Sequence, residues 1–260
     1  MAGWTLITGA SEGLGAEFAR LAAAEGRNLI LTARSEDKLR ALAEALRGCA
    51  GEIAVIPADL ADPAGAQHLW QKAAIGRRIE ILVNNAGLGR HGAFGNGEGW
   101  DRELATITVN MTALSLLMKM AIPHMRAERG GHILNVASTA AFMPGPNMAV
   151  YHASKAYVLS LTEAVAEELR GTDVHVCALC PGATQTSFFD AADMHGITLL
   201  SLARPASAEA VARAGWHAMK AGHRLHVTGA MNKLFAFAPR LTPRGLTTFI
   251  TAKVMGKQGR

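Results

Sequence analysis

The chain has little of what marks several classes of protein. Only 18% of its 260 residues are charged, and no basic cluster interleaved with aromatic residues occurs, so the net charge of +5 does not indicate nucleic-acid binding. The longest stretch without a charged residue, residues 133–154, contains Pro144 and Pro146 and would make a poor transmembrane helix. Because Trp4 already begins the first expected strand, there is no room for a signal peptide, and we expect a cytoplasmic protein.

Cysteine is also scarce. Of the three cysteines, Cys177 and Cys180 form a Cys-x-x-Cys pair, a pattern typical of zinc and redox sites. They lie in residues 174–180, which have the apolar character of a buried parallel strand. Residues three apart on a strand face opposite sides of the sheet, and no second ligand pair lies near them in the sequence. We therefore predict two core cysteines and no metal site.

Half of the residues are apolar, and they occur in short runs that alternate with helical patterns. This alternation is typical of βαβ units and predicts a doubly wound parallel sheet of about seven strands with helices on both faces. No repeat or linker interrupts it, so we expect residues 1–260 to form a single domain. The expected strands lie near residues 4–8, 28–33, 53–57, 79–84, 132–138, 174–180 and 224–228, and the expected helices near 13–25, 36–47, 63–75, 98–127, 150–170 and 207–221.

A glycine-rich turn joins the first expected strand to the first expected helix. Residues 8–15 read Thr-Gly-Ala-Ser-Glu-Gly-Leu-Gly, a Gly-x-x-x-Gly-x-Gly spacing that differs from the common dinucleotide fingerprint. Glycines at such a turn permit positive φ and let a pyrophosphate approach the backbone, while the helix N-terminus offers N–H groups to the phosphates. The turn therefore indicates a nucleotide site at the carboxyl ends of the strands.

Two polar residues lie together in the expected helix 150–170. Tyr151 and Lys155 are four residues apart, so their side chains point to one side of the helix, one turn apart. We expect the ammonium to lower the pKa of the phenol and make Tyr151 a proton donor and acceptor near neutral pH. Ser138, at the end of the expected strand 132–138, is positioned to hydrogen-bond a carbonyl oxygen.

Together, seven segments resemble the motifs of the short-chain dehydrogenase/reductase family, in the family's order and at its distances. They are residues 8–15, Asp59-Leu60, Asn84-Asn85-Ala86-Gly87, Asn110, Ser138, Tyr151-x-x-x-Lys155 and Pro181-Gly182-x-x-x-Thr186. The resemblance covers nearly the whole chain. It implies a Rossmann fold and an oxidoreductase that transfers a hydride between a nicotinamide dinucleotide and a carbonyl or secondary alcohol, without a metal.

The resemblance also implies roles for individual residues. Ser138 and Tyr151 would bond the carbonyl oxygen, and Lys155 would hold the nicotinamide ribose. Asn110 would hold a water that relays protons from Lys155, although a packed Asn110 bonded to a neighbouring backbone group is an open alternative. The implied cofactor-binding residues, besides Tyr151 and Lys155, are Gly9, Ser11, Glu12, Gly13, Leu14, Gly15, Arg34, Asp59, Leu60, Asn85, Ala86, Gly87, Pro181, Gly182, Thr184 and Thr186.

The residues after the second expected strand bear on the choice of cofactor. NAD-dependent enzymes usually have an acid there, whereas this chain has Arg34, which suits the 2′-phosphate of NADP(H). Many NADP-dependent relatives have a basic residue where this chain has Glu12, which could repel the phosphate or pair with Arg34. The alternative is a solvent-facing Arg34 before the helix 36–47. We predict NADP(H) over NAD(H).

Residues 187–206 do not fit the repeating βαβ unit. They combine Phe188, Phe189 and Met194 with acidic residues and glycine. The resemblance makes this segment the substrate-binding loop, and a pair of ordinary surface helices is the alternative. The apolar content favours a moderately hydrophobic ketone, aldehyde or 3-oxoacyl substrate and does not separate these from one another.

Two other classes of protein stay open. Residues 9–13 also match Gly-x-Ser-x-Gly, the nucleophile elbow of serine hydrolases, with Ser11 as nucleophile. That interpretation leaves Gly15, Tyr151 and Lys155 unexplained and lacks a visible partner histidine. The other class is a non-catalytic nucleotide-binding scaffold or sensor, which would not need Tyr151 and Lys155.

The expected helices 98–127 and 150–170 carry more apolar residues than one sheet contact uses. Examples are Met111, Leu114, Leu117, Met118 and Met125 on the first helix and Val158, Leu159, Leu161 and Val165 on the second. Excess apolar surface must be covered, and the family commonly pairs these helices across a two-fold axis. We therefore predict a homodimer or homotetramer.

The last expected region is the tail, residues 231–260, which Pro239 and Pro243 divide into two short helical pieces. It alternates apolar and basic residues, so it could lie on an anionic membrane surface. The favoured interpretation is that its apolar side covers the open end of the substrate cleft or an oligomer contact, because tertiary packing is the commoner use of such a face.

Overall fold

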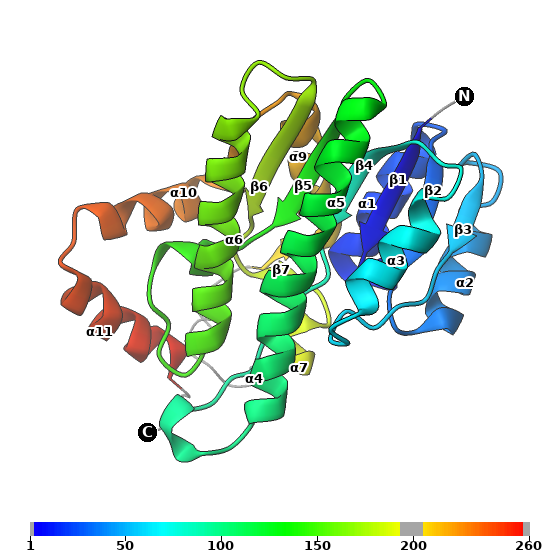
Figure 1. Ribbon diagram of the computed structural model, residues 1–260. Coiled ribbons are helices and arrows are strands. Elements are labelled where there is room, and N and C mark those ends of the chain that lie inside the picture. Colours follow the sequence, from blue (N-terminus) through cyan, green and yellow to red (C-terminus); the bar gives the residue numbers. More distant parts are fainter. Residues whose placement is uncertain (1–2, 193–204, 257–260) are drawn as a thin grey trace.

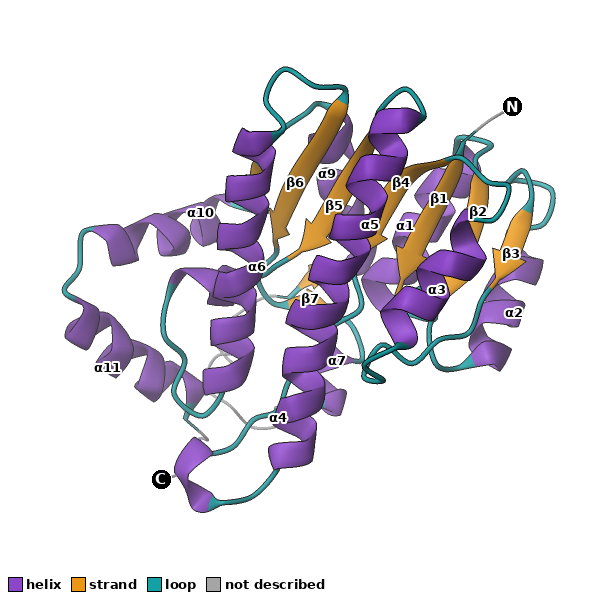
Figure 2. Ribbon diagram, in the orientation of Figure 1, coloured by secondary structure: helices purple, strands orange, loops and turns teal. Residues whose placement is uncertain are grey.

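The protein forms a seven-stranded parallel sheet covered by helices on both faces (Figures 1 and 2). The structure is a computed structural model and describes residues 3–192 and 205–256. The strand order is β3-β2-β1-β4-β5-β6-β9, which confirms the predicted doubly wound sheet. The strands are β1 (Trp4–Thr8), β2 (Asn28–Thr32), β3 (Ile53–Val55), β4 (Ile79–Asn84), β5 (Gly131–Val136), β6 (Val174–Cys180) and β9 (Leu225–Val227).

Two hydrophobic cores lie on opposite faces of the sheet. One is covered by α3 (Gly65–Ala74), α5 (Leu114–Ala127) and α6 (Ala149–Glu168), and the other by α1 (Gly13–Ala24), α2 (Glu36–Ala45) and α9 (Ala208–Lys220). Successive strand residues alternate between the cores, as Leu6 and Ile7 do. Cys180 packs in the first core and Cys177 in the second, which confirms that the two face opposite sides.

The helix from Trp100 to Ala127 is long and apolar enough to cross a membrane, judged by length and composition alone. It consists of α4 (Trp100–Ile107), the π-helical turn η2 (Thr108–Ala113) and α5. Here it is a core helix, because one side of it, from Val109 to Met125, packs into the hydrophobic core, whereas Trp100 and Leu104 near its start are exposed. The buried apolar residues are Val109, Ala113, Leu114, Leu117, Met118, Ala121 and Met125.

This packing corrects the reason given above for an oligomer. Leu114, Leu117, Met118 and Met125 belong to the predicted excess apolar surface, but each is at most 5% exposed within a single chain. Val158 and Leu159 of α6 are buried as well. Tertiary packing covers these six residues, so they carry no argument for a partner. Met111, Leu161 and Val165 are half-buried, and the homo-oligomer stays a prediction.

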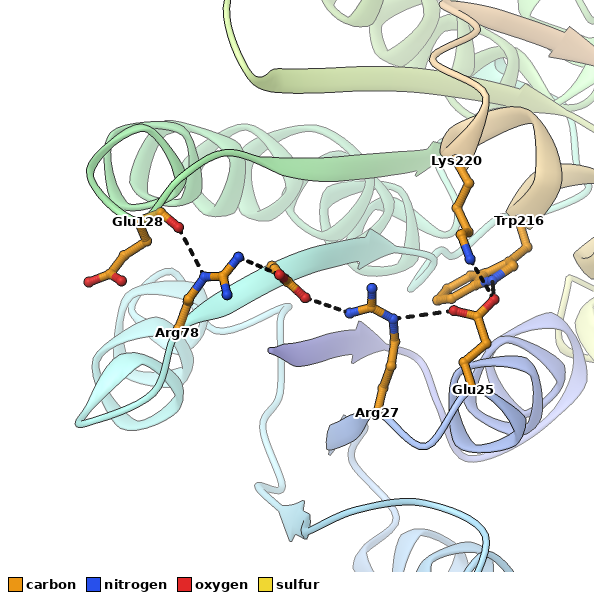
Figure 3. Close-up of polar contacts among 7 residues, drawn as sticks. Glu25, Arg27, Arg78, Glu128, Trp216 and Lys220 are labelled. Atoms are coloured by element: carbon orange, nitrogen blue, oxygen red, sulfur yellow. Dashed lines mark hydrogen bonds and ion pairs between the residues drawn. The ribbon is translucent and has the colours of Figure 1, made fainter. Parts of the chain in front are cut away.

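The amino ends of the strands carry a row of ion pairs (Figure 3). Arg27 bonds Glu80 at 2.8 Å and Glu25 at 3.3 Å, and Glu80 also pairs with Arg78. Glu25 in turn accepts hydrogen bonds from Trp216 Nε1 and Lys220 Nζ of α9, both at 2.8 Å. The row therefore ties β4, the α1–β2 turn and α9 together at this edge.

After β6 the chain builds the outer wall of the site. β7 (Thr184–Gln185) pairs with β8 (Ala206–Ser207), and α7 (Phe188–Ala191) follows β7. Of the predicted substrate loop 187–206, residues 193–204 lie outside the described residues. The tail forms α10 (Ala230–Phe237), the 3-10 turn η4 (Ala238–Arg240) and α11 (Arg244–Met255), which confirms two helical pieces. Smaller 3-10 turns are η1 (Phe94–Asn96) and η3 (Thr139–Phe142).

Candidate active site

The glycine turn closes tightly between β1 and α1. Gly9 has φ +64°, and a Cβ there would press against Asn85 and the backbone of Ala86. A Cβ on Gly15 would overlap the carbonyl oxygen of Gly9, so the first turn of α1 can approach the end of β1 only with glycine at this position. No side chain caps the N-terminus of α1, which leaves its N–H groups facing outward for a ligand.

Asn85 and Thr8 hold this turn in place. The Asn85 side-chain amide donates to the carbonyl oxygens of Thr8 and Gly9, at 2.9 and 3.1 Å. The Thr8 hydroxyl accepts the backbone N–H groups of Asn85 and Ala86, both at 3.0 Å. The segment after β4 is thus bonded directly to the segment after β1, and the two motifs form one structural unit.

Lys155 and Tyr151 lie at the centre of the carboxyl edge of the sheet. Lys155 is 5% exposed, and its Nζ donates to the carbonyl oxygen of Val136 at 2.8 Å. The same nitrogen lies 5.8 Å from the centroid of the Tyr151 ring. Ser138, the N-cap residue of η3, accepts the backbone N–H of Ala140 at 3.1 Å and lies within hydrogen-bonding reach of the Tyr151 phenol.

The pKa values of this pair differ from the expectation. Burial raises the pKa of Tyr151 to about 12, and the hydrogen bond with Ser138 only partly offsets this. Burial lowers the pKa of Lys155 to about 8. The expected lowering of the Tyr151 pKa by Lys155 is therefore wrong for this structure, because desolvation outweighs the hydrogen bond with Ser138 and Lys155 is not among the causes of the shift. The phenol holds its proton at neutral pH, which suits a proton donor.

Asn110 is bonded within the protein. Its Nδ2 donates to the carbonyl oxygen of Leu88 and to the Ser154 hydroxyl, both at 2.9 Å, and its Oδ1 accepts the Leu88 N–H at 2.8 Å. Ser154 donates in turn to the carbonyl oxygen of Tyr151 at 2.7 Å. Asn110 lies in the π-helical turn η2, a deviation that often marks functional sites. These bonds match the packed-asparagine alternative and connect three elements of the site, while the water relay stays a prediction.

Most of the predicted site residues line one cavity of about 1100 Å³. Every predicted catalytic or cofactor-binding residue lines it except Gly15 and Asn110, which lie behind the wall and position residues that do. The sequence reasoning missed Lys38, Arg102 and Asn232 as lining residues. Nothing in a single sequence marks them, since each reaches the cavity from an element that carries no motif.

The adenosine end of the cavity is positively charged. Arg34 is exposed, lines the cavity and forms no ion pair with a described residue. Its charge, together with burial, lowers the pKa of Arg102, so the two guanidinium groups lie close enough to interact. Glu12 pairs with Lys38 at 2.7 Å, so of its two alternatives, repelling the phosphate or pairing with Arg34, the second is wrong.

The opposite end of the cavity is apolar. Met148, Ala192 and Met255 form a small cluster with Tyr151, Phe188 and Phe189 packed against it. The rings of Tyr151 and Phe188 lie 5.2 Å apart between centroids. Phe235, Ile250 and Val254 extend this wall. A bound molecule would therefore meet mostly hydrocarbon at this end, besides polar groups of Tyr151, Ser138, His152 and Thr251.

Other chemistries find less support in this geometry. Across residues 3–192 and 205–256, no group of three or more His, Cys, Asp or Glu side chains could hold a metal ion. Ser11 lies in the glycine turn and lines the cavity, but no histidine of the described chain hydrogen-bonds it. A hydrolase mechanism through Ser11 would therefore lack its general base.

Comparisons with known proteins agree with this geometry. Residues 3–195 match the family model described as short chain dehydrogenase. Human 17-beta-hydroxysteroid dehydrogenase type 3 is 33% identical over 193 residues. The match covers 72% of this chain and 61% of the human protein, which is less than two thirds of its length. A short-chain dehydrogenase from Sphingobium yanoikuyae in complex with NADPH has a TM-score of 0.82 at 30% identity, covering 94% of both chains. One from Burkholderia phymatum in complex with NAD has a TM-score of 0.80 at 26% identity, covering 94% of this chain and 96% of that one.

The chain therefore belongs to the short-chain dehydrogenase/reductase family and is an NAD(P)-dependent oxidoreductase that acts on CH–OH or carbonyl groups. The predicted family and Rossmann fold are confirmed. The residues around the cavity fit such a cofactor, because the uncapped helix N-terminus, the glycine turn and Arg34 follow one another along its wall.

Proposed function

We propose that this enzyme uses NADP(H) to interconvert a moderately hydrophobic carbonyl compound and its secondary alcohol. The observation that carries the proposal is the cavity of about 1100 Å³, which runs from Arg34, without an ion-pair partner in the described part of the chain, past the glycine turn to Tyr151 and an apolar wall. When bound, the cofactor supplies or accepts the hydride. The protein orients the carbonyl oxygen, moves the proton and excludes water.

Tyr151 is the proton donor in the reduction direction. Its raised pKa keeps the phenol protonated at neutral pH, and the nearby Ser138 hydroxyl gives the carbonyl oxygen a second hydrogen-bond partner. Two donors on one oxygen polarise the carbonyl and stabilise the negative charge that develops there. Lys155, held by the Val136 carbonyl oxygen, is positioned to bond the nicotinamide ribose and to place positive charge near the developing alkoxide.

The preference for NADP(H) rests on Arg34. Its exposed guanidinium has no carboxylate partner among residues 3–192 and 205–256 and can form a bidentate pair with a 2′-phosphate. The nearby Arg102 adds positive charge. Glu12, the acid that would otherwise repel the phosphate, forms an ion pair with Lys38. The relatives include both an NADPH complex and an NAD complex, so the preference comes from this chain's own residues.

The substrate class follows from the wall opposite the glycine turn. Met148, Phe188, Phe189 and Met255 offer hydrocarbon and aromatic surface beside Tyr151. A ketone, aldehyde or 3-oxoacyl compound with an apolar body would bury that body there and leave only its carbonyl at Ser138 and Tyr151.

A panel of carbonyl compounds with NADPH tests the proposal, with loss of NADPH absorbance as the readout. We expect turnover to rise with the apolar size of the compound and to disappear in Tyr151→Phe, while NADPH affinity stays unchanged. Turnover that survived in Tyr151→Phe would contradict the assigned chemistry. A protein that bound NADPH but reduced no member of the panel would instead favour a scaffold.

A further inference from the structure

Exposed apolar side chains gather in one part of the molecule, the C-terminal arm, residues 230–256. Of the 13 large hydrophobic residues that are exposed in the described chain, eight lie in the arm. They are Met231, Leu234, Phe235, Phe237, Leu241, Leu246, Phe249 and Ile250. Phe235 and Ile250 line the cavity, whereas the other six do not. In Figures 1 and 2, α10 and α11 extend from one flank of the body beyond α6.

Helix α11 is built with its apolar residues outward. Its buried positions are Thr247, Thr251 and Met255, one turn apart, and the Thr251 hydroxyl bonds the carbonyl oxygen of Thr247 at 2.9 Å within the same helix. Phe249 is 57% exposed. A surface helix of a water-soluble protein normally shows the opposite arrangement, with its apolar stripe toward the core. The exposed side of α11 is therefore better suited to an apolar environment than to water.

The arm is also purely cationic. It carries Lys233, Arg240, Arg244 and Lys253, and no Asp or Glu occurs anywhere in residues 210–260. None of these four cations pairs with an acid among the described residues. Lys253 Nζ lies 4.7 Å from the centroid of the exposed Phe249 ring, so charge and apolar surface occupy the same face.

The same helices form the apolar end of the cavity. Ile250, Val254 and Met255 of α11 and Phe235 of α10 line it, and His91 bonds the carbonyl oxygen of Met255 at 2.8 Å, which anchors the end of α11 beside the site. The exposed face of the arm is thus continuous with the wall against which an apolar substrate would lie.

We propose that the C-terminal arm docks on an anionic lipid surface, so that the enzyme takes a carbonyl substrate dissolved in the membrane. Aromatic and aliphatic side chains beside unpaired cations are what an anionic bilayer interface favours. A second copy of the chain suits this face less, because a two-fold contact would bring four cations against the same four cations of the partner. The docking rests on the arm alone, whereas the membrane-dissolved substrate also rests on the proposed function.

Two matched double variants test the docking. The arm variant Leu241→Gln/Arg244→Gln removes one exposed apolar residue, 77% exposed, and one cation three positions away. The control Lys72→Gln/Ile75→Gln at the end of α3 removes a similar pair, with Ile75 73% exposed, far from the arm in sequence. None of the four residues lines the large cavity, so both variants should keep full turnover of a water-soluble carbonyl.

The full-length chain is sedimented with sucrose-loaded vesicles of phosphatidylcholine alone and of phosphatidylcholine with phosphatidylglycerol. We expect binding to the anionic vesicles only, weakened by added salt. Each basic residue near such a surface contributes about fivefold, so with the lost apolar side chain the arm variant should partition at least tenfold less. The control variant should bind like the unmodified protein, and circular dichroism checks that both variants fold.

Three outcomes would overturn the docking. They are no binding to anionic vesicles, equal binding by the arm and control variants, and light scattering that shows self-association lost only in the arm variant while vesicles stay unbound. That last outcome would assign the face to a second copy. Turnover is assayed separately without vesicles, so vesicle binding without Tyr151-dependent turnover would contradict the proposed function and leave the docking intact.

Discussion

The two edges of the parallel sheet carry polar clusters that are built in opposite ways. At the amino edge, Glu80 has a 23% exposed side chain and pairs with Arg27 and Arg78. At the carboxyl edge, Lys155 is 5% exposed and bonds only a backbone carbonyl oxygen, and Tyr151 lies beside it without a charged partner. The charges at the first edge form ion pairs with one another, whereas Lys155 and Arg34 at the second edge form no ion pair with a described residue.

The pKa shifts follow the same contrast. Burial works to raise the pKa values of Glu25 and Glu80, but hydrogen bonds and nearby cations outweigh it and lower both. Burial lowers the pKa of Lys155 to about 8 with little opposition. A lowered carboxyl pKa stabilises the folded protein at neutral pH, whereas a lowered lysine pKa means that burying the charge costs stability. The ion pairs at the amino edge therefore stabilise the fold. At the carboxyl edge, the buried Lys155 destabilises the folded protein, and its proposed role is in catalysis.

The largest expected effect is at the carboxyl edge, in Tyr151→Phe. Removal of the phenol hydroxyl removes the proton donor, so we expect kcat to fall by about two orders of magnitude or more. Cofactor affinity, measured by fluorescence titration, should hardly change. A variant that kept most of its activity on a true substrate would show that the buried polar edge is not where the proton comes from.

Lys155→Met should stabilise the cofactor-free enzyme while it abolishes activity and weakens cofactor binding. The folded pKa of about 8 lies below the ordinary 10.5, so between these values the unfolded chain holds a proton that the folded one lacks. Lys155 therefore costs stability below about pH 8, and the cost is relieved as pH rises toward 10.5. We expect a gain of about 3 kcal/mol at pH 7 that shrinks with rising pH.

Urea denaturation of both proteins between pH 7 and 10 measures that gain as a difference. Cys177 and Cys180 are buried and also contribute to the pH dependence of stability at high pH. Because both cysteines are present in the unmodified enzyme and in Lys155→Met, they affect the stability difference between the two proteins little. Lys119→Met, at an exposed position, is the control and should change stability by a few tenths of a kcal/mol at most. A destabilised Lys155→Met protein would mean that Lys155 strengthens the fold and the contrast between the edges fails.

Arg34→Ala should discriminate between the two cofactors. The lost charge-assisted bonds to a 2′-phosphate predict NADPH affinity about tenfold or more lower, with NADH affinity nearly unchanged. Glu12→Gln, which frees Lys38, is the complementary variant and should strengthen NADPH binding slightly. Competing titrations measure both, and equal losses for the two cofactors in Arg34→Ala would remove the case for NADP(H).

The smallest effect is expected at the amino edge, in Glu80→Gln. The ion pairs are partly exposed, so we expect a loss of about 1 kcal/mol in the free energy of unfolding and no change in kcat/KM. Because the folded pKa is lowered, this contribution is present above the ordinary carboxyl pKa and is lost as pH falls through the folded value. Denaturation at pH 7 and pH 4 checks the sign, with the exposed Glu44→Gln as control. A fall in turnover would show that the two edges are coupled.

Much of this protein follows from local sequence. The alternation of apolar runs is enough to predict the sheet and its helices, because strand and helix periodicities are local properties. The turn at residues 8–15 and the Tyr151–Lys155 spacing are also local, and they identify the site before any contact is known. Pro239 and Pro243 likewise predict where the tail divides.

What only the tertiary structure decided depends on surroundings supplied by distant segments. Burial of Tyr151, which packs against Phe188 and the cluster of Met148, Ala192 and Met255, sets the direction of its pKa shift, and the spacing to Lys155 does not. Lys38 pairs with Glu12 across the α1 and α2 ends, and Arg102 joins Arg34 at the cavity, although no motif connects them. Leu114 and Met118 prove to be core residues, whereas Leu241 and Phe249 prove to be exposed. All four side chains are apolar, so their residue types do not distinguish them. Only the packing of the folded chain determines which apolar residues are buried in the core and which are exposed.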